Sequence, residues 1–136
     1  MKHAELYIDG AAKGNPGPAG IGVIICRDGE ILKNIAQYIG RATNNVAEYT
    51  ALIRGLQEAM ALKVQKVIVN TDSELLCRQI KKEYKVKAPH IIDLYKRAVE
   101  LISGFKEVTV RHIPREENRG ADKLANIAVK KAAVKG

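Results

Sequence analysis

The opening third of the chain alternates between apolar and polar positions, which is typical of half-buried β-strands. Leu6 and Ile8 share one face of the first such segment, and Asp9 ends it on the opposite face. Asp28-Gly29, a hairpin turn signal, joins two further segments of the same kind. The pattern therefore predicts three antiparallel strands, at residues 5–9, 21–26 and 31–39.

A helical period replaces this alternation in the middle of the chain. Apolar residues recur at the spacing of one helix face, at Tyr49, Leu52, Ile53, Leu56 and Met60. They predict a helix over 45–62, which Thr43 or Asn44 caps. The short apolar run 67–69 predicts a buried strand.

The remaining elements complete an α/β order. Pro89 suits the first turn of a helix and Gly104 its end. We expect helices after Ser73 to Ile80, over 89–102 and over 120–133, with a strand at 108–113. The order βββαβααβα predicts a five-stranded mixed sheet, three antiparallel strands followed by parallel ones, with helices on both faces.

Composition narrows the class of protein. The 136 residues suit a single domain, 1–136, and 46% hydrophobic with 28% charged residues is typical of a globular chain. No apolar run is long enough for a membrane helix, and Glu5 and Asp9 interrupt any signal peptide. Two cysteines cannot form a disulfide framework or a four-ligand zinc site. We expect a reduced, cytoplasmic protein that makes no membrane contact.

The charge balance points to a polyanionic partner. Lys and Arg number 23 against 15 Asp and Glu, a net charge of +8. Residues 78–97 contain seven basic and two acidic side chains. Candidates for phosphate contact there are Lys81, Lys82, Lys85 and Lys87, and a solvated surface is the alternative.

Four acidic side chains stand at the ends of predicted elements: Asp9, Glu48, Asp72 and Asp122. Because ligands gather at the carboxyl ends of strands in α/β sheets, we expect these carboxylates to meet at one rim of the sheet. Close carboxylates repel one another unless a cation lies among them. Ligands that are all oxygen favour Mg²⁺ or Mn²⁺ over zinc.

A plainer interpretation exists for two of these acids. Asp72 and Asp122 each stand at a helix start, where an acid can cap the helix or complement its dipole. Asp9 ends a strand and precedes Gly10, so it has no capping role. The acids therefore predict a metal site more strongly together than singly.

Polar and glycine-rich segments flank the acids. The glycines of 13–20 permit close approach of a backbone or a sugar, and residues 43–45 begin a helix, where phosphate binds well. An ordinary turn and an ordinary helix cap are the alternatives. The candidates for substrate contact are Gly10, Asn15, Thr43, Asn44 and Asn45.

Four segments in this order resemble the ribonuclease H family, type 1. They are 7–11 with 14–20, 43–48, 70–73, and Asn118 with 121–125, and each contains one of the four acids. The resemblance spans nearly the whole chain, from Leu6 to Val129. It implies the ribonuclease H fold, with Asp9, Glu48, Asp72 and Asp122 as catalytic, metal-binding carboxylates.

The resemblance also implies a reaction. Members of the family hydrolyse the RNA strand of RNA–DNA hybrids with two Mg²⁺ ions, with Mn²⁺ as an alternative, and leave 5′-phosphate and 3′-hydroxyl ends. Reading the 2′-hydroxyl rather than the bases gives little sequence preference. We expect a monomer without an obligatory protein partner. The alternatives are a double-stranded RNA substrate, or a non-catalytic nucleic-acid-binding member of the same fold.

The chain departs from well-known bacterial members in two respects. It has no tryptophan and only a short basic segment at 81–87, so it resembles a compact subset without the basic protrusion. His112 lies at the family's expected distance before the last acid, but it shares a strand face with Val108 and Val110. His112 is therefore a candidate for proton transfer, but we expect it to be a core or strand residue, with Arg115 and Glu116 as the nearest alternatives for that role.

Overall fold

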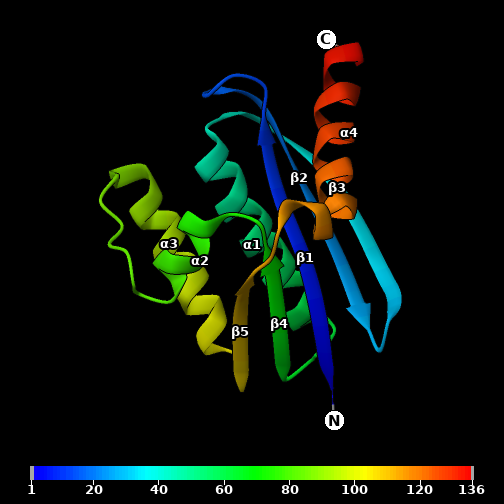
Figure 1. The fold of residues 1–136 in the computed structure, drawn as a ribbon, viewed down its shortest axis with the longest axis vertical. Coiled ribbons are helices and arrows are strands. Elements are labelled where there is room, and N and C mark those ends of the chain that lie inside the picture. Colours follow the sequence, from blue (N-terminus) through cyan, green and yellow to red (C-terminus); the bar gives the residue numbers. More distant parts are fainter. Residues whose placement is uncertain (1, 136) are drawn as a thin grey trace.

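Five strands form one mixed sheet in the computed structural model, which describes residues 2–135 (Figure 1). The order across the sheet is β3-β2-β1-β4-β5. The strands are β1 (His3–Ala12), β2 (Gly17–Arg27), β3 (Glu30–Ala42), β4 (Lys66–Thr71) and β5 (Glu107–His112). The predicted element order and mixed sheet are confirmed, and the first three strands extend beyond their predicted limits.

Strand register places β1 at the centre of the sheet. β1 runs antiparallel to β2, with Asp9 opposite Gly22. It runs parallel to β4, and this ladder ends at the pair Ile8 and Thr71. Asp9, the next residue of β1, and Asp72, which follows β4, therefore lie close together where the parallel pairing of the two strands ends.

Helices cover both faces of the sheet. They are α1 (Asn44–Ala61), α2 (Glu74–Ile80), α3 (Pro89–Ser103) and α4 (Arg119–Lys135), with a short 3₁₀ helix η1 (Arg115–Glu117) before α4. α1 packs on β1 and β2 and carries α3 on its outer side, whereas α4 lies on the opposite face, over β2 and its neighbours (Figure 1). None of the helices within residues 2–135 has the length and apolar character needed to cross a bilayer.

The main core lies between the sheet and α1. Leu6 and Ile8 of β1 are fully buried against Leu52 and Leu56 of α1, as the alternation and the helical stripe predict. Burial of these side chains is the main stabilising term for this layer. Cys77 is buried at the edge of the same core, and Cys26 is half-buried; both are free thiols.

Two serine or threonine caps fix the starts of α1 and α2. The Oγ1 of Thr43 accepts a hydrogen bond from the backbone N–H of Val46 at 3.2 Å. The Oγ of Ser73 accepts one from Leu76 at 3.2 Å, so Ser73 caps α2 and the capping interpretation of Asp72 is wrong. With a serine to cap the helix, the Asp72 carboxylate has no capping role.

Candidate active site

Three of the predicted carboxylates converge at one edge of the sheet. Asp9 comes from β1, Glu48 from the first turns of α1, and Asp72 follows β4. One carboxylate oxygen of each lies within 4.8 Å of the others. The parallel register of β1 and β4 brings the two aspartates together, and the approach of α1 to β1 adds Glu48.

Asp122 lines the same cleft from the opposite face of the sheet. It lies in the first turn of α4, which rests directly on β2 because Gly22 has no side chain: a Cβ there would overlap the backbone of Ala121. Since Gly22 is opposite Asp9 in the ladder, this contact brings the start of α4 to the acids. The amide of Asn126 donates to Asp122 Oδ1 at 3.2 Å.

The four acids border an open cleft of about 700 Å³. Its other walls are the end of β1, the first turn of α1, the start of α2 and the loop before α4. The lining residues are Asp9, Gly10, Ala11, Ala12, Asn15, Asn44, Asn45, Glu48, Asp72, Ser73, Leu75, Arg115, Asp122 and Asn126. A cleft of this size and polarity admits a sugar–phosphate backbone.

The electrostatics of the cleft favour a bound cation. Burial, together with the neighbouring Glu48, Asp122 and Asp72, raises the pKa of Asp9 to about 10. Burial is also the main cause that raises the pKa of Glu48 to about 8; the charges of Asp72 and Asp122 add to this shift, whereas hydrogen bonds with Asp9 and the Gly10 backbone oppose it. Proton uptake would relieve the repulsion among these carboxylates, and so would the binding of a divalent cation.

One carboxylate oxygen in the cleft supports the binding of a divalent cation. Glu48 Oε2 is buried and has no hydrogen-bond partner among the residues that the structure describes. A buried carboxylate oxygen without a partner costs free energy. Carboxylate oxygens are the ligands that Mg²⁺ and Mn²⁺ prefer, so this donor set fits such a cation.

Amide side chains brace the wall of the cleft. Asn15 Oδ1 accepts a hydrogen bond from the backbone N–H of Asn44 at 3.0 Å, and Asn44 Oδ1 accepts one from Ala12 at 3.0 Å. These bonds hold the loop after β1 against the start of α1. Asn45 Oδ1 is buried without a partner. Thr43 caps α1 and does not line the cleft.

Gly10 is a candidate for substrate contact, and the structure also gives it a packing role. It lines the cleft, but its Cα faces the backbone of α1, and a Cβ would overlap the peptide between Ala47 and Glu48. The glycine therefore permits close packing of β1 and α1, which brings Asp9 and Glu48 together.

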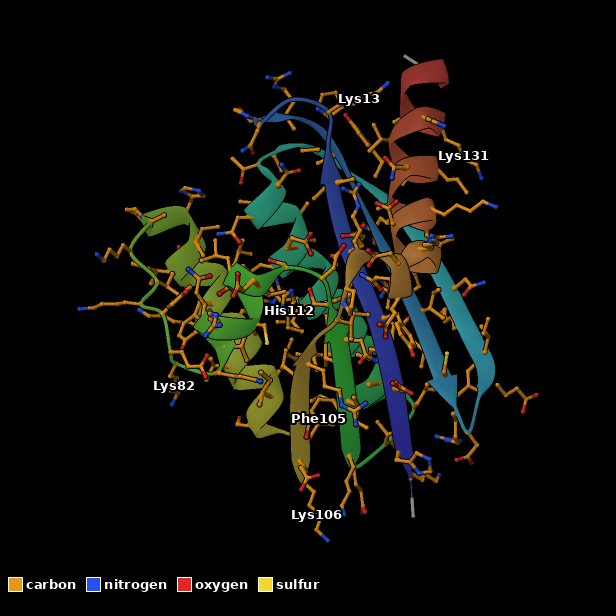
Figure 2. All side chains as sticks on the ribbon, viewed as in Figure 1. Lys13, Lys82, Phe105, Lys106, His112 and Lys131 are labelled. Carbon is orange, nitrogen blue, oxygen red and sulfur yellow. The ribbon has the colours of Figure 1, made fainter. Side chains whose placement is uncertain are left out.

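Of the three proton-transfer candidates, the structure brings only Arg115 to the cleft. Glu116 is exposed and does not line it. His112 lies in β5, as predicted, although the strand ends there and not at Ile113. Its side chain is exposed, so it is a strand residue and not a core residue. β5 is an edge strand and α2 is short, so the helical layer does not cover this end. His112 lies beside α2, in a small hollow apart from the acids (Figure 2).

The basic segment also lies outside the cleft. Lys81, Lys82, Lys85 and Lys87 are all exposed on the connection between α2 and α3, and none lines the acidic cleft. Figure 2 shows Lys82 on the α2–α3 side of the molecule, far from Lys13 in the loop after β1. A duplex that contacts these lysines would have to extend beyond the cleft.

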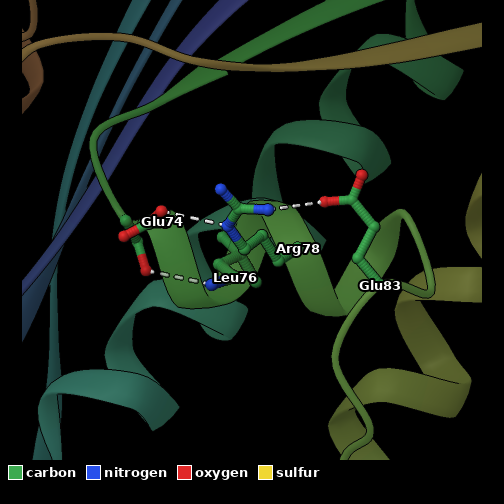
Figure 3. A network of polar contacts seen from close by, with 5 residues as sticks. Glu74, Leu76, Arg78 and Glu83 are labelled. Carbon is green, nitrogen blue, oxygen red and sulfur yellow. Dashed lines mark hydrogen bonds and ion pairs between the residues drawn. The ribbon is translucent and has the colours of Figure 1, made fainter.

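Arg78 is not free for such contacts, because acidic side chains neutralise it (Figure 3). Its guanidinium bonds Glu74 at 3.0 Å and Glu83 at 3.1 Å. It also stacks over the ring of Tyr84, 5.3 Å from the centroid. The network holds Glu83 and Tyr84 of the basic segment against α2. The four lysines of the segment are left without such acidic partners among residues 2–135.

Some residues of the cleft were not predicted from the sequence. Asn126 lies four residues after Asp122, on the same helix face, and that spacing is the signal that could have identified it. Ser73 and Leu75 line the cleft because α2 starts at its edge. They carry no chemical signature of their own.

Comparisons with known proteins agree with this geometry. A family model described as reverse transcriptase-like matches residues 7–128. The chain is 43% identical over 130 residues to the bifunctional protein Rv2228c of Mycobacterium tuberculosis, covering 94% of this chain and 36% of that protein. It is 36% identical over 147 residues to ribonuclease H of Pseudomonas putida, covering 96% of each. The chain thus spans about a third of the mycobacterial relative.

A solved structure extends the likeness to three dimensions. LC11-RNase H1, in complex with an RNA/DNA hybrid, superposes with a TM-score of 0.91 at 43% identity, covering 96% of this chain and 99% of that one. The match covers all the elements that carry the four acids. The fold, the acidic cleft and these relatives together show that the chain belongs to the type 1 ribonuclease H family.

Proposed function

We propose that this chain is an endonuclease that hydrolyses the RNA strand of RNA–DNA hybrids. The observation that carries the proposal is the convergence of Asp9, Glu48 and Asp72, with Asp122 on the same cleft. Its relative LC11-RNase H1 is seen in complex with an RNA/DNA hybrid, and the Pseudomonas putida relative is a ribonuclease H. The net charge of +8 suits a polyanionic substrate.

The four acids would hold two Mg²⁺ ions, or Mn²⁺ in their place. Asp9 neighbours all three other acids and would hold both ions, together with Glu48 and Asp72 for one of them and Asp122 for the other. When bound, such a pair activates water and stabilises the leaving 3′ oxygen. Breaking the bond between phosphorus and that oxygen leaves 5′-phosphate and 3′-hydroxyl ends.

The amide side chains of Asn15, Asn44 and Asn45, which we call the amide wall of the cleft, would position the RNA strand. Asn15 and Asn44 each use their oxygen within the protein, which leaves their NH₂ groups free to donate. Asn45 lines the cleft beside them, where its amide would meet a 2′-hydroxyl, the group that distinguishes RNA from DNA. These contacts read sugar and backbone rather than bases, so we expect little sequence preference.

Arg115 would act through its charge. A guanidinium stays protonated in proteins and cannot serve as a general base. From the rim of the cleft, Arg115 can instead stabilise negative charge on the scissile phosphate. The proton that leaves the attacking water would then pass to solvent through the open cleft.

A parallel cleavage assay tests the proposal. Labelled RNA–DNA hybrid, double-stranded RNA and double-stranded DNA are incubated with the protein in Mg²⁺, Mn²⁺ or EDTA, and the product ends are mapped. We expect metal-dependent cuts in the RNA strand of the hybrid, 5′-phosphate ends, and no cleavage by Asp9→Asn. Cleavage of double-stranded RNA alone would change the substrate, and binding without cleavage would leave a non-catalytic member of the family.

A further inference from the structure

Asn118 stands in the fourth family-like segment but has no role in the reaction as described. Its side chain is 1% exposed, and it lies just before α4. We propose that Asn118 is a positioning residue that sets Asp9, Asp122 and Arg115 relative to one another. The inference rests on the proposed function, because it assumes that the acids hold metal ions.

The first observation is the bond that the Asn118 side chain makes to β1. Its Nδ2 donates to the carbonyl of Ile8 at 2.8 Å, and that carbonyl belongs to the peptide that leads into Asp9. The ladder between β1 and β4 ends at Ile8 and Thr71. The Asn118 amide therefore holds β1 at the residue where its hydrogen-bonded pairing with β4 ends.

The second observation is that the backbone of Asn118 makes hydrogen bonds to the backbones of Asp122 and Arg115. Its carbonyl accepts from the N–H of Asp122 at 3.1 Å and so fixes the first turn of α4. Its own N–H donates to the carbonyl of Arg115 at 3.0 Å and closes the loop. One buried residue is thus bonded directly to the strand before Asp9, to Asp122 and to Arg115.

The third observation is that packing alone does not require an asparagine here. Asn118 Oδ1 is buried and has no hydrogen-bond partner within the described part of the chain, which costs free energy. An apolar side chain of similar size would avoid that cost. The Nδ2 donor is what leucine lacks, and the bond to Ile8 is therefore the reason for the amide.

Two variants and a matched control test the inference. Asn118→Ala removes the side chain, and Asn118→Leu keeps its volume without the donor. The control is Asn70→Ala: Asn70 is 2% exposed and its amide also donates to a β1 carbonyl, that of Leu6 at 3.2 Å, but it has no bond to Asp122 or Arg115. For each protein we would measure thermal unfolding, the affinity for Mn²⁺ alone by calorimetry, and kcat and KM on the hybrid.

For both Asn118 variants we expect kcat or the Mn²⁺ affinity to fall by about 10- to 100-fold, the effect typical of groups that orient metal ligands. KM for the hybrid should stay within about twofold, since the amide wall is untouched. Asn70→Ala should lose thermal stability but keep its Mn²⁺ affinity.

Three results would overturn the inference. If the Asn118 variants unfold earlier but match wild type in kcat and Mn²⁺ affinity, Asn118 is only structural. The same conclusion follows if neither variant folds while Asn70→Ala does. If the wild type itself neither binds Mn²⁺ nor cleaves the hybrid, the proposed function fails first and the inference with it.

Discussion

Gly10 and Glu48 are in direct contact through their backbones: a Cβ on Gly10 would lie 2.5 Å from the backbone nitrogen of Glu48. This approach brings the end of β1 against the first turns of α1, so that Asp9 and Glu48 face the same cleft. The distance between the Asp9 and Glu48 carboxylates thus depends on a residue that has no side chain.

Gly10→Ala should therefore impair both stability and catalysis. The new methyl group must push α1 away from β1, and overpacking of this kind costs about 1–3 kcal/mol. A shift of about 1 Å in a metal ligand can lower kcat by about 10²-fold. Urea denaturation and single-turnover cleavage would measure the two effects.

Gly29→Ala is the control for this substitution. Gly29 has a φ of +78° in the hairpin between β2 and β3, and nothing lies within 4 Å of its missing side chain. Alanine there should cost stability through its backbone conformation but leave cleavage unchanged. Equal losses of activity in the two variants would show that Gly10 has no special link to the acids.

The metal-free protein should lose stability as the pH rises. The pKa of Asp9 is raised to about 10 and that of Glu48 to about 8, whereas both groups ionise near pH 4 in an unfolded chain. Between these values the folded state binds more protons, so the free energy of unfolding falls with increasing pH. Denaturation in EDTA at about pH 5.5 and about pH 8.5 would reveal this slope.

Asp9→Asn should flatten that slope and stabilise the metal-free protein at the higher pH, because one acid leaves the cluster. Mn²⁺ should raise the melting temperature of the wild type, more at about pH 8.5 than at about pH 5.5, since ion binding displaces protons. It should have little effect on Asp9→Asn. A variant that Mn²⁺ stabilises as much as wild type would contradict the metal site.

The convergence of Asp9 and Asp72 followed from the sequence because each acid comes at or shortly after the end of an apolar strand segment. The apolar segments before Asp9 and Asp72 place both acids at one sheet edge once their strands are parallel neighbours. The helical stripe through Leu52 adds Glu48 in the same way. These patterns are local and repeat along several residues.

The exposure of His112 could not be predicted from the sequence. Alternation shows which residues of a strand lie on the same face of the sheet, but not whether a helix covers that face. Val110 is buried on that face, whereas His112 is exposed in the hollow beside α2. The bonds that tie Asn15 to Asn44 are also specific to the folded loop. Such relations depend on the lengths and ends of elements, which are the least regular features of a sequence pattern.

The lysines of the connection between α2 and α3 should contribute to binding rather than to chemistry. We expect simultaneous replacement of Lys81, Lys82, Lys85 and Lys87 by alanine to raise KM with little change in kcat, because they are exposed and outside the cleft. The salt slope of hybrid affinity should become shallower, by at most about 0.9 for each phosphate that a lysine no longer neutralises. An unchanged slope would identify the segment as a solvated surface.

Arg115 and His112 give the last prediction, because they lie three residues apart but in different surroundings. Arg115 lines the cleft with the four acids, whereas His112 lies in the hollow beside α2 with Glu74 and Lys81. Arg115→Ala should lower the single-turnover rate by about 10-fold or more, because it removes a positive charge near the scissile phosphate.

His112→Ala should leave the rate near that of wild type and change stability by no more than about 0.5 kcal/mol, as expected of an exposed side chain away from a site. Single-turnover rates and melting temperatures of the two variants would be compared in the same buffer. A large loss of rate in His112→Ala, at an unchanged melting temperature, would assign proton transfer to His112. That result would require the end of β5 to move toward the acids when the hybrid binds, because the side chain does not line the cleft in the free protein.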